Sequence, residues 1–125
     1  MRSIEAIQPL PGVLPRDTTP LENWGPPPHV LSGCPETRGV SAFASLDGAF
    51  TAGVWECTPG KWRIHFAEDE LSVLLSGKIV VTDQAGQHRT FVAGDAFVIP
   101  AGFLGTLEVV ETARKIFALH DRPAA

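Results

Sequence analysis

From Val40 onward, short apolar runs alternate with tight-turn signals, and this spacing constrains the fold more than any other feature of the chain. The turn signals contain the residues that tight turns require, glycine for positive φ and proline for its preset φ. They are Asp47-Gly48, Pro59-Gly60, Ser76-Gly77, Gln84-Ala85-Gly86, Gly94-Asp95 and Pro100-Ala101-Gly102. No convincing helical stripe occurs between residues 40 and 120. The pattern predicts an all-β antiparallel sandwich or barrel.

The apolar runs between these turns give the predicted strands. They are Val40–Leu46, Phe50–Cys57, Trp62–Phe66, Leu71–Ser76, Lys78–Asp83, His88–Phe91, Ala96–Ile99, Gly105–Val110 and Arg114–Leu119. We therefore assign residues 39–125 to one barrel.

The first part of the chain is proline-rich: eight of the eleven prolines lie at or before Pro35. Proline lacks an amide donor and fixes φ, so this part cannot form a long helix or a central strand. Residues 1–38 are predicted to be an extended arm. Apolar side chains such as Ile7, Leu21 and Trp24 recur through it. We expect the arm to pack on its own barrel or on a partner subunit.

Composition excludes several classes of function. A chain of 125 residues with net charge -4 and no lysine- or arginine-rich run is not expected to bind nucleic acid. No apolar stretch approaches the roughly 20 residues of a membrane span. No secretory signal is visible, so a cytoplasmic location is expected. Cys34 and Cys57 lack metal-type spacing and are expected to be reduced thiols.

The segment Lys61–Phe66 has two different faces, because side chains alternate along a strand. Trp62, Ile64 and Phe66 share one face, and Lys61, Arg63 and His65 share the other. If the polar face looks into water, this is an ordinary half-buried strand. If it looks into a barrel, Arg63 and His65 line a cavity.

Two spaced motifs resemble those of the cupin superfamily. His65, Glu70 and Gly77 resemble the second half of the first motif, G-x5-H-x-H-x3,4-E-x6-G. Gly94, Pro100 and Gly102 resemble the opening of the second motif, G-x5-P-x-G-x2-H-x3-N. The two motifs together cover roughly residues 55–110. The resemblance implies a cupin-type jelly-roll β-barrel.

Further segments resemble the single-domain cupin family named after (S)-ureidoglycine aminohydrolase. They are Gly53-Val54-Trp55-Glu56, Pro59-Gly60-Lys61-Trp62, Gly94-Asp95-Ala96-Phe97, Pro100-Ala101-Gly102-Phe103, Glu108-Val109-Val110 and Arg114-Lys115. This resemblance implies a homodimer with a pocket lined by motif residues. It does not by itself imply the aminohydrolase reaction.

The chain departs from the cupin motifs at metal-ligand positions. Arg63 stands where the first motif has its first histidine, and Gly105 stands where the second motif has its histidine. Of the usual three histidines and one glutamate, His65 and Glu70 remain, one short of a common catalytic set. We expect no cofactor, and a divalent metal only if another residue completes the site.

The same substitution suggests a metal-free ligand pocket formed by Arg63, His65, Glu70, Trp55 and Lys115. The guanidinium of Arg63 has the planar donor fork that suits a carboxylate or phosphate. Alternatively, Arg63 and Glu70 neutralise each other, His65 is a satisfied polar residue, Trp55 supplies buried area, and Lys115 is solvated.

Three functions follow from these alternatives. The first is a small-molecule-binding protein with a degenerate metal site. The second is a metal-assisted hydrolase of a small nitrogenous metabolite, resembling ureidoglycine aminohydrolase. The third is a dimeric interaction module without a small ligand. Whether the protein is an enzyme stays open at this point.

Overall fold

The structure, a computed structural model, describes residues 3–13 and 17–121, which form nine strands and one short 3-10 helix. The helix η1 spans Ile4–Ala6. The strands are β1 (Glu22–Gly25), β2 (Val30–Gly33), β3 (Thr37–Ala44), β4 (Phe50–Cys57), β5 (Gly60–His65), β6 (Asp69–Asp83), β7 (His88–Val92), β8 (Ala96–Ile99) and β9 (Leu104–His120).

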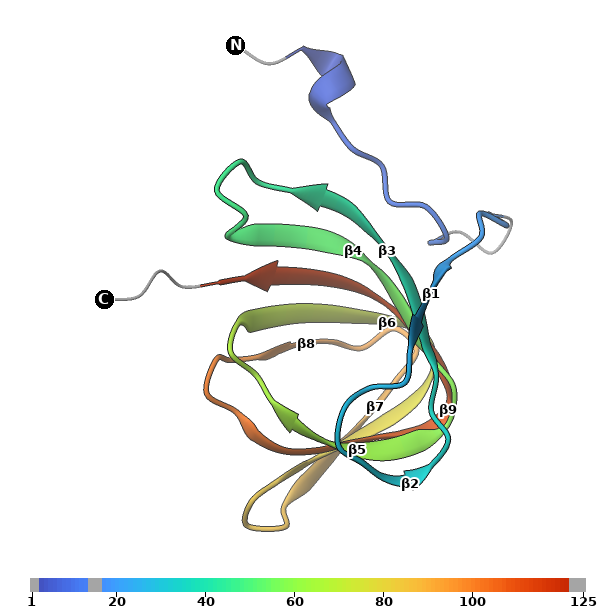
Figure 1. Ribbon diagram of the computed structural model, residues 1–125, viewed down its shortest axis with the longest axis vertical. Coiled ribbons are helices and arrows are strands. Elements are labelled where there is room, and N and C mark those ends of the chain that lie inside the picture. Colours follow the sequence, from blue (N-terminus) through green and yellow to red (C-terminus); the bar gives the residue numbers. More distant parts are fainter. Residues whose placement is uncertain (1–2, 14–16, 122–125) are drawn as a thin grey trace.

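All strand pairs are antiparallel, and they form one sheet with the order β1-β3-β4-β9-β5-β2. Strand β6 pairs with β9 over most of its length and also with β7 and β8. Strands β6 and β9 are long, with 15 and 17 residues, so each pairs with different strands along its length. Strand β6 pairs with β8 and then β7, and β9 pairs with β5 and then β4. The sheet curls into a half-barrel (Figure 1). The all-β prediction is confirmed, and the curled sheet agrees with the jelly-roll barrel that the cupin resemblance implies.

The turn predicted at Ser76-Gly77 is wrong, because β6 runs through it without a break. Gly77 has a φ of 88°, and the register of β6 against β9 shifts on both sides of it. A Cβ at Gly77 would lie 2.3 Å from the carbonyl oxygen of Thr112. The glycine thus allows a β-bulge where two strands approach closely. The break predicted between residues 110 and 114 is likewise absent, since β9 is continuous.

The N-terminal region contributes strands to both ends of the sheet path. Strand β1 pairs with β3 at one end, and β2 pairs with β5 at the other. These two strands were not predicted from the sequence. Nearer the N-terminus, the Gly12 carbonyl accepts a hydrogen bond of 2.9 Å from Arg114 Nη1. The described part of this region therefore contacts its own barrel.

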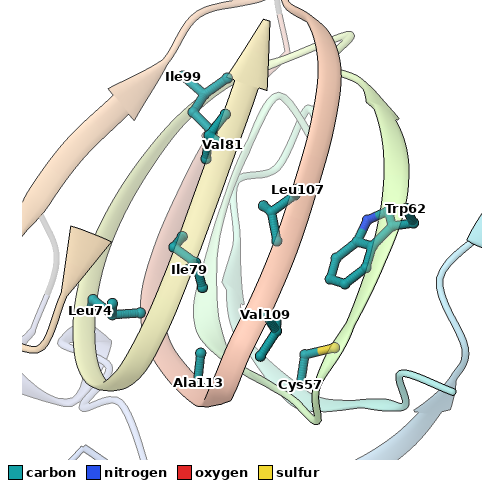
Figure 2. Close-up of a cluster of buried hydrophobic side chains, with 9 residues drawn as sticks. All are labelled: Cys57, Trp62, Leu74, Ile79, Val81, Ile99, Leu107, Val109 and Ala113. Atoms are coloured by element: carbon teal, nitrogen blue, oxygen red, sulfur yellow. The ribbon is translucent and has the colours of Figure 1, made fainter. Parts of the chain in front are cut away.

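One side of the curled sheet is lined by a buried hydrophobic cluster, and we call this side the inner face. The cluster's side chains come from β4, β5, β6, β8 and β9, and Figure 2 shows how they lie along the curled sheet. They are Cys57, Trp62, Leu74, Ile79, Val81, Ile99, Leu107, Val109 and Ala113. Their burial gives the barrel its main source of stability.

Candidate ligand-binding site

An ion pair lies among these apolar side chains. Lys115 on β9 and Glu70 on β6 are 5% and 7% exposed. The Lys115 Nζ donates a hydrogen bond of 3.1 Å to Glu70 Oε2, and the Ser72 hydroxyl lies 3.3 Å from the same oxygen. The strands place these groups together because Glu70, Ser72 and Lys115 all occupy inward positions of the alternating pattern.

Trp55 on β4 completes this polar group. It is the cross-strand partner of Lys115, and the Lys115 Nζ lies 4.6 Å from its ring centroid. This is a cation–π geometry, in which the face of the indole ring attracts an ammonium group. The Trp55 ring also contacts Trp62, with centroids 6.3 Å apart. The ion pair is thus continuous with the apolar cluster of Figure 2.

The buried thiol beside this group is not a candidate nucleophile. Burial raises the pKa of Cys57 to about 12, against the opposing effect of the Lys115 charge. The thiolate is the reactive form of cysteine, and it is scarcely populated at such a pKa. Cys57 therefore acts as a small core residue.

The other two predicted pocket residues lie elsewhere. Trp62 is buried on the inner face, so the alternation of side chains directs Arg63 and His65 to the outer side of β5, where both are exposed. With His29, they line a shallow hollow of about 520 Å³. The backbone holds this hollow through a 3.2 Å hydrogen bond from Arg63 N to the His29 carbonyl. Glu70 pairs with Lys115 and not with Arg63.

The metal-ligand chemistry suggested by the motif does not fit this arrangement. His65 is exposed on the outer side of the wall, whereas Glu70 is buried on the inner face and held by an ammonium group. Within residues 3–13 and 17–121, no group of three or more His, Cys, Asp or Glu side chains could hold a metal ion. A divalent cation commonly needs such a set. We therefore derive no reaction step through a metal.

A larger cleft of about 610 Å³ opens between β7 and β8. These strands pair with different parts of β6 and not with each other, and the stacked rings of Phe91 and Phe97 connect them. Aromatic and aliphatic side chains form its walls, with polar groups from the β6–β7 hairpin along one side. The lining residues are Val81, Asp83, Gln87, His88, Arg89, Phe91, Ala96, Phe97, Val98, Ile99, Pro100 and Phe103.

The cleft is adjacent to the buried ion pair. Its wall residues Ile99 and Phe97 are the cross-strand partners of Glu70 and Ser72. Directly paired residues point to the same face of a sheet, so these four side chains share the inner face. Val81 and Ile99 lie together at one end of the cluster in Figure 2, and both line the cleft. A molecule in the cleft would therefore lie one strand away from Glu70.

Sequence reasoning did not single out Arg89, Phe91 and Phe97, which line the cleft. The available signal was the alternation in His88–Phe91, which places Arg89 and Phe91 on one face. That pattern does not reveal which face is inward. The answer depends on the pairing of Arg89 with Val81 and of Phe91 with Ile79, both long-range contacts.

The antiparallel half-barrel is consistent with a cupin jelly roll. Residues 44–117 match the family model of the EutQ-like cupin domain, and the chain belongs to this family. No curated protein matches it. In the part of the chain that the structure describes, no helix is long and apolar enough to cross a membrane.

Solved structures share this fold. A protein of unknown function from Pseudomonas syringae is 24% identical, with a TM-score of 0.75, over 82% of this chain and 45% of that one. The chain thus spans less than half of that protein. The EutQ protein of Clostridium difficile is 18% identical, with a TM-score of 0.61, over 70% and 69% of the two chains. An ethanolamine utilization protein Q of Salmonella typhimurium is 19% identical, with a TM-score of 0.63, over 79% of each chain.

Proposed function

We propose that this cupin domain binds a small organic molecule in the cleft between β7 and β8, beside the buried polar group of Glu70, Lys115 and Trp55. The observation that carries the proposal is the Lys115–Glu70 pair, 3.1 Å apart in a hydrophobic interior and one strand from that cleft. Burying two charges costs solvation free energy, and replacing such a pair with apolar residues of similar volume often leaves the stability unchanged or raises it. A few polar groups beside an apolar cleft are typical of a site that orients a ligand.

The aromatic walls support the same proposal. Phe91 and Phe97 stack with centroids 3.9 Å apart and line the cleft. Ligand sites are concave and mostly apolar, with a few polar groups that fix orientation. The volume of about 610 Å³ is in the range of small-molecule sites.

A thermal-shift panel of small carboxylates, ureides and amines tests this function. A compound at about one hundred times its dissociation constant adds roughly 2.7 kcal/mol of stability, which raises the melting temperature by several degrees. The double variant Glu70→Gln, Lys115→Met should lose part of that stabilisation. Arg38→Gln, which breaks the more exposed Arg38–Glu56 ion pair, is the matched control and should retain the stabilisation by the compound. No stabilisation of the wild-type protein by any member of the panel would contradict the proposal.

The metal-assisted hydrolase implied by the ureidoglycine aminohydrolase resemblance is the alternative, and no observation of this structure favours it. This function would need His65 and Glu70 to bind the same metal ion, but the two side chains lie on opposite sides of the barrel wall. Near-stoichiometric metal in protein purified without chelator, lost in Glu70→Gln, would give this alternative the lead.

We also propose that the chain forms a homodimer through the outer face of the sheet. One row of cross-strand partners there is entirely apolar: Phe43, Ala52, Ala118, Leu71 and Val98. Leu71 and Val98 are 45% and 61% exposed. Contiguous exposed apolar surface favours association, and a self-complementary patch suits a twofold dimer.

Light scattering coupled to size exclusion tests the dimer. We expect a mass of twice 13.4 kDa for the wild-type chain and the monomer mass for Leu71→Glu. Val92→Glu replaces a similarly exposed apolar residue on β7, outside the row, and should leave the dimer intact. A monomeric wild-type chain would contradict this proposal.

We further propose a cytoplasmic location, where the free thiols Cys34 and Cys57 would stay reduced.

A further inference from the structure

We infer that the cleft between β7 and β8 is selective for a flat, aromatic carboxylate, and that the guanidinium of Arg89 is the group that recognises its anionic end. This inference rests on the proposed function and names the chemical class of ligand for the same cleft.

Arg89 is placed to meet a ligand. It is the cross-strand partner of Val81, a member of the buried cluster, so its side chain leaves β7 on the inner side. It lines the cleft. Within the described residues, no carboxylate forms an ion pair with it. A planar guanidinium without a partner presents two parallel donors that fit a carboxylate.

The other charged group of the cleft is engaged within its own turn. Asp83 Oδ1 accepts hydrogen bonds from the amides of Ala85 and Gln87, at 2.9 and 3.0 Å. These two hydrogen bonds hold the carboxylate within its own turn. His88 lines the same cleft and adds a ring nitrogen that can donate a hydrogen bond. Arg89 is therefore the cleft's arginine for an anionic ligand, whereas Asp83 is held by backbone amides.

The apolar walls determine the shape of the ligand. Phe91 and Phe97 are nearly parallel, with an interplanar angle of 16°, and Phe103 lines the same cleft. Aromatic walls favour a flat ring, which can stack or meet them edge to face. A ring with a carboxylate at one end would place the ring against the phenylalanines and the anion toward Arg89.

Calorimetric titration with benzoate, benzylamine and acetate tests each part of this inference. Benzoate should bind in the millimolar range or better. Acetate lacks the ring, and benzylamine has the opposite charge, so each should bind at least about tenfold more weakly. Equal binding of benzoate and benzylamine, or a preference for benzylamine, would overturn the assignment of Arg89. Equal binding of benzoate and acetate would overturn the role of the aromatic walls.

Two matched variants locate the anion site. Arg89→Gln should weaken benzoate binding at least about tenfold while changing the melting temperature by less than about 2 °C, because Arg89 is exposed. Arg89→Lys keeps the charge but loses the fork, and should bind with intermediate affinity. Arg63→Gln removes the exposed arginine of the outer hollow and should bind benzoate as the wild-type chain does. Loss of binding in Arg63→Gln and not in Arg89→Gln would overturn the inference.

The outcome is separable from that of the proposed function. If benzoate fails to bind but a ureide or an amine of the thermal-shift panel stabilises the protein, the aromatic-carboxylate inference is wrong and small-molecule binding stands. If nothing in either experiment binds, both are wrong.

Discussion

Lys115 and Glu70 are 45 residues apart in the sequence, yet Nζ and Oε2 lie 3.1 Å apart on the inner face of the barrel. Both side chains are at least nine-tenths buried, and Trp55 covers the ammonium group. This pair is the feature that distinguishes the interior from an ordinary hydrophobic core. It joins the two longest strands of the sheet, β6 and β9.

Removing one partner of this pair should be far more harmful than removing both. Lys115→Met leaves the Glu70 carboxylate buried and unpaired, and should lower the free energy of unfolding by about 3–5 kcal/mol. The double variant Glu70→Leu, Lys115→Met leaves no orphaned charge and should recover much of that loss. Urea unfolding of the single and double variants measures the difference. A loss below about 1 kcal/mol in Lys115→Met would show that water reaches the pair.

The stability of the protein should depend on pH through Glu56. Burial alone would raise the pKa of this carboxyl, but hydrogen bonds and charges of Arg38 and Arg114 outweigh it and hold the pKa below its usual 4.5. The Arg114 Nε donates a 2.9 Å hydrogen bond to Glu56 Oε2, and Arg38 contacts the other oxygen. Because the folded-state pKa is depressed, the unfolded chain binds the proton first as the pH falls. The stabilisation is present above about pH 4.5 and is lost as the pH falls through the folded-state value.

Glu56→Gln isolates this contribution. At neutral pH the variant should be less stable than the wild-type chain by about 1–2 kcal/mol. The difference should shrink once the pH falls below 4.5, the usual value for a glutamate. Urea unfolding at a series of pH values between neutral and about pH 3 gives the measurement. A difference that is independent of pH would mean that the two arginines do not stabilise the ionised form.

The two cysteines should differ sharply in reactivity. Cys34 is exposed, whereas Cys57 is fully buried with its pKa raised to about 12, chiefly by burial. Alkylation of the folded protein, followed by mass spectrometry, should therefore modify one thiol per chain, and unfolding in urea should release the second. Cys34→Ser should show no rapid modification while folded. Rapid labelling of Cys57 in the folded chain would contradict its placement in the core.

A pair of glycine substitutions tests the bulge in β6. Gly77 and Gly86 have similar φ values, 88° and 86°, so alanine is strained at both. At Gly77 the added Cβ would also lie 2.3 Å from a backbone oxygen, whereas nothing lies within 4 Å at Gly86. Gly86→Ala should cost about 1 kcal/mol, and Gly77→Ala should cost at least about 2 kcal/mol more or prevent folding. Equal effects in thermal unfolding would mean that β9 does not approach Gly77 closely.

The all-β class could be predicted from the sequence because local signals determine it. Turn glycines and short alternating runs gave most strands of the barrel within a few residues. The continuity of β6 through Gly77 could not be predicted this way, since a glycine with positive φ serves a turn and a bulge equally well. Strands β1 and β2 could not be predicted because prolines flank them and argue against strands. Their pairing with β3 and β5 is also long-range, so no local signal indicates it.

The candidate site was predicted only in part for the same reason. Glu70, Lys115 and Trp55 do come together on the inner face. Arg63 and His65 lie on the outer side, because Trp62 occupies the inward position of β5. The alternation of apolar and polar residues in β5 predicts two different faces, but it does not predict which face is buried. Long-range packing determines which face of β5 is buried, because Trp62 packs against Trp55 and the rest of the cluster.

The most direct test of the account is to map benzoate binding on the backbone amide NMR spectrum of the wild-type chain. We predict that the largest shifts cluster on β7 and β8, at Arg89, Phe91, Phe97 and Ile99, with smaller shifts at their β6 partners, Glu70 and Ser72. Shifts centred on His29, Arg63 and His65 would place the site in the outer hollow and contradict the account. No shifts at millimolar benzoate would contradict the aromatic-carboxylate assignment of the cleft.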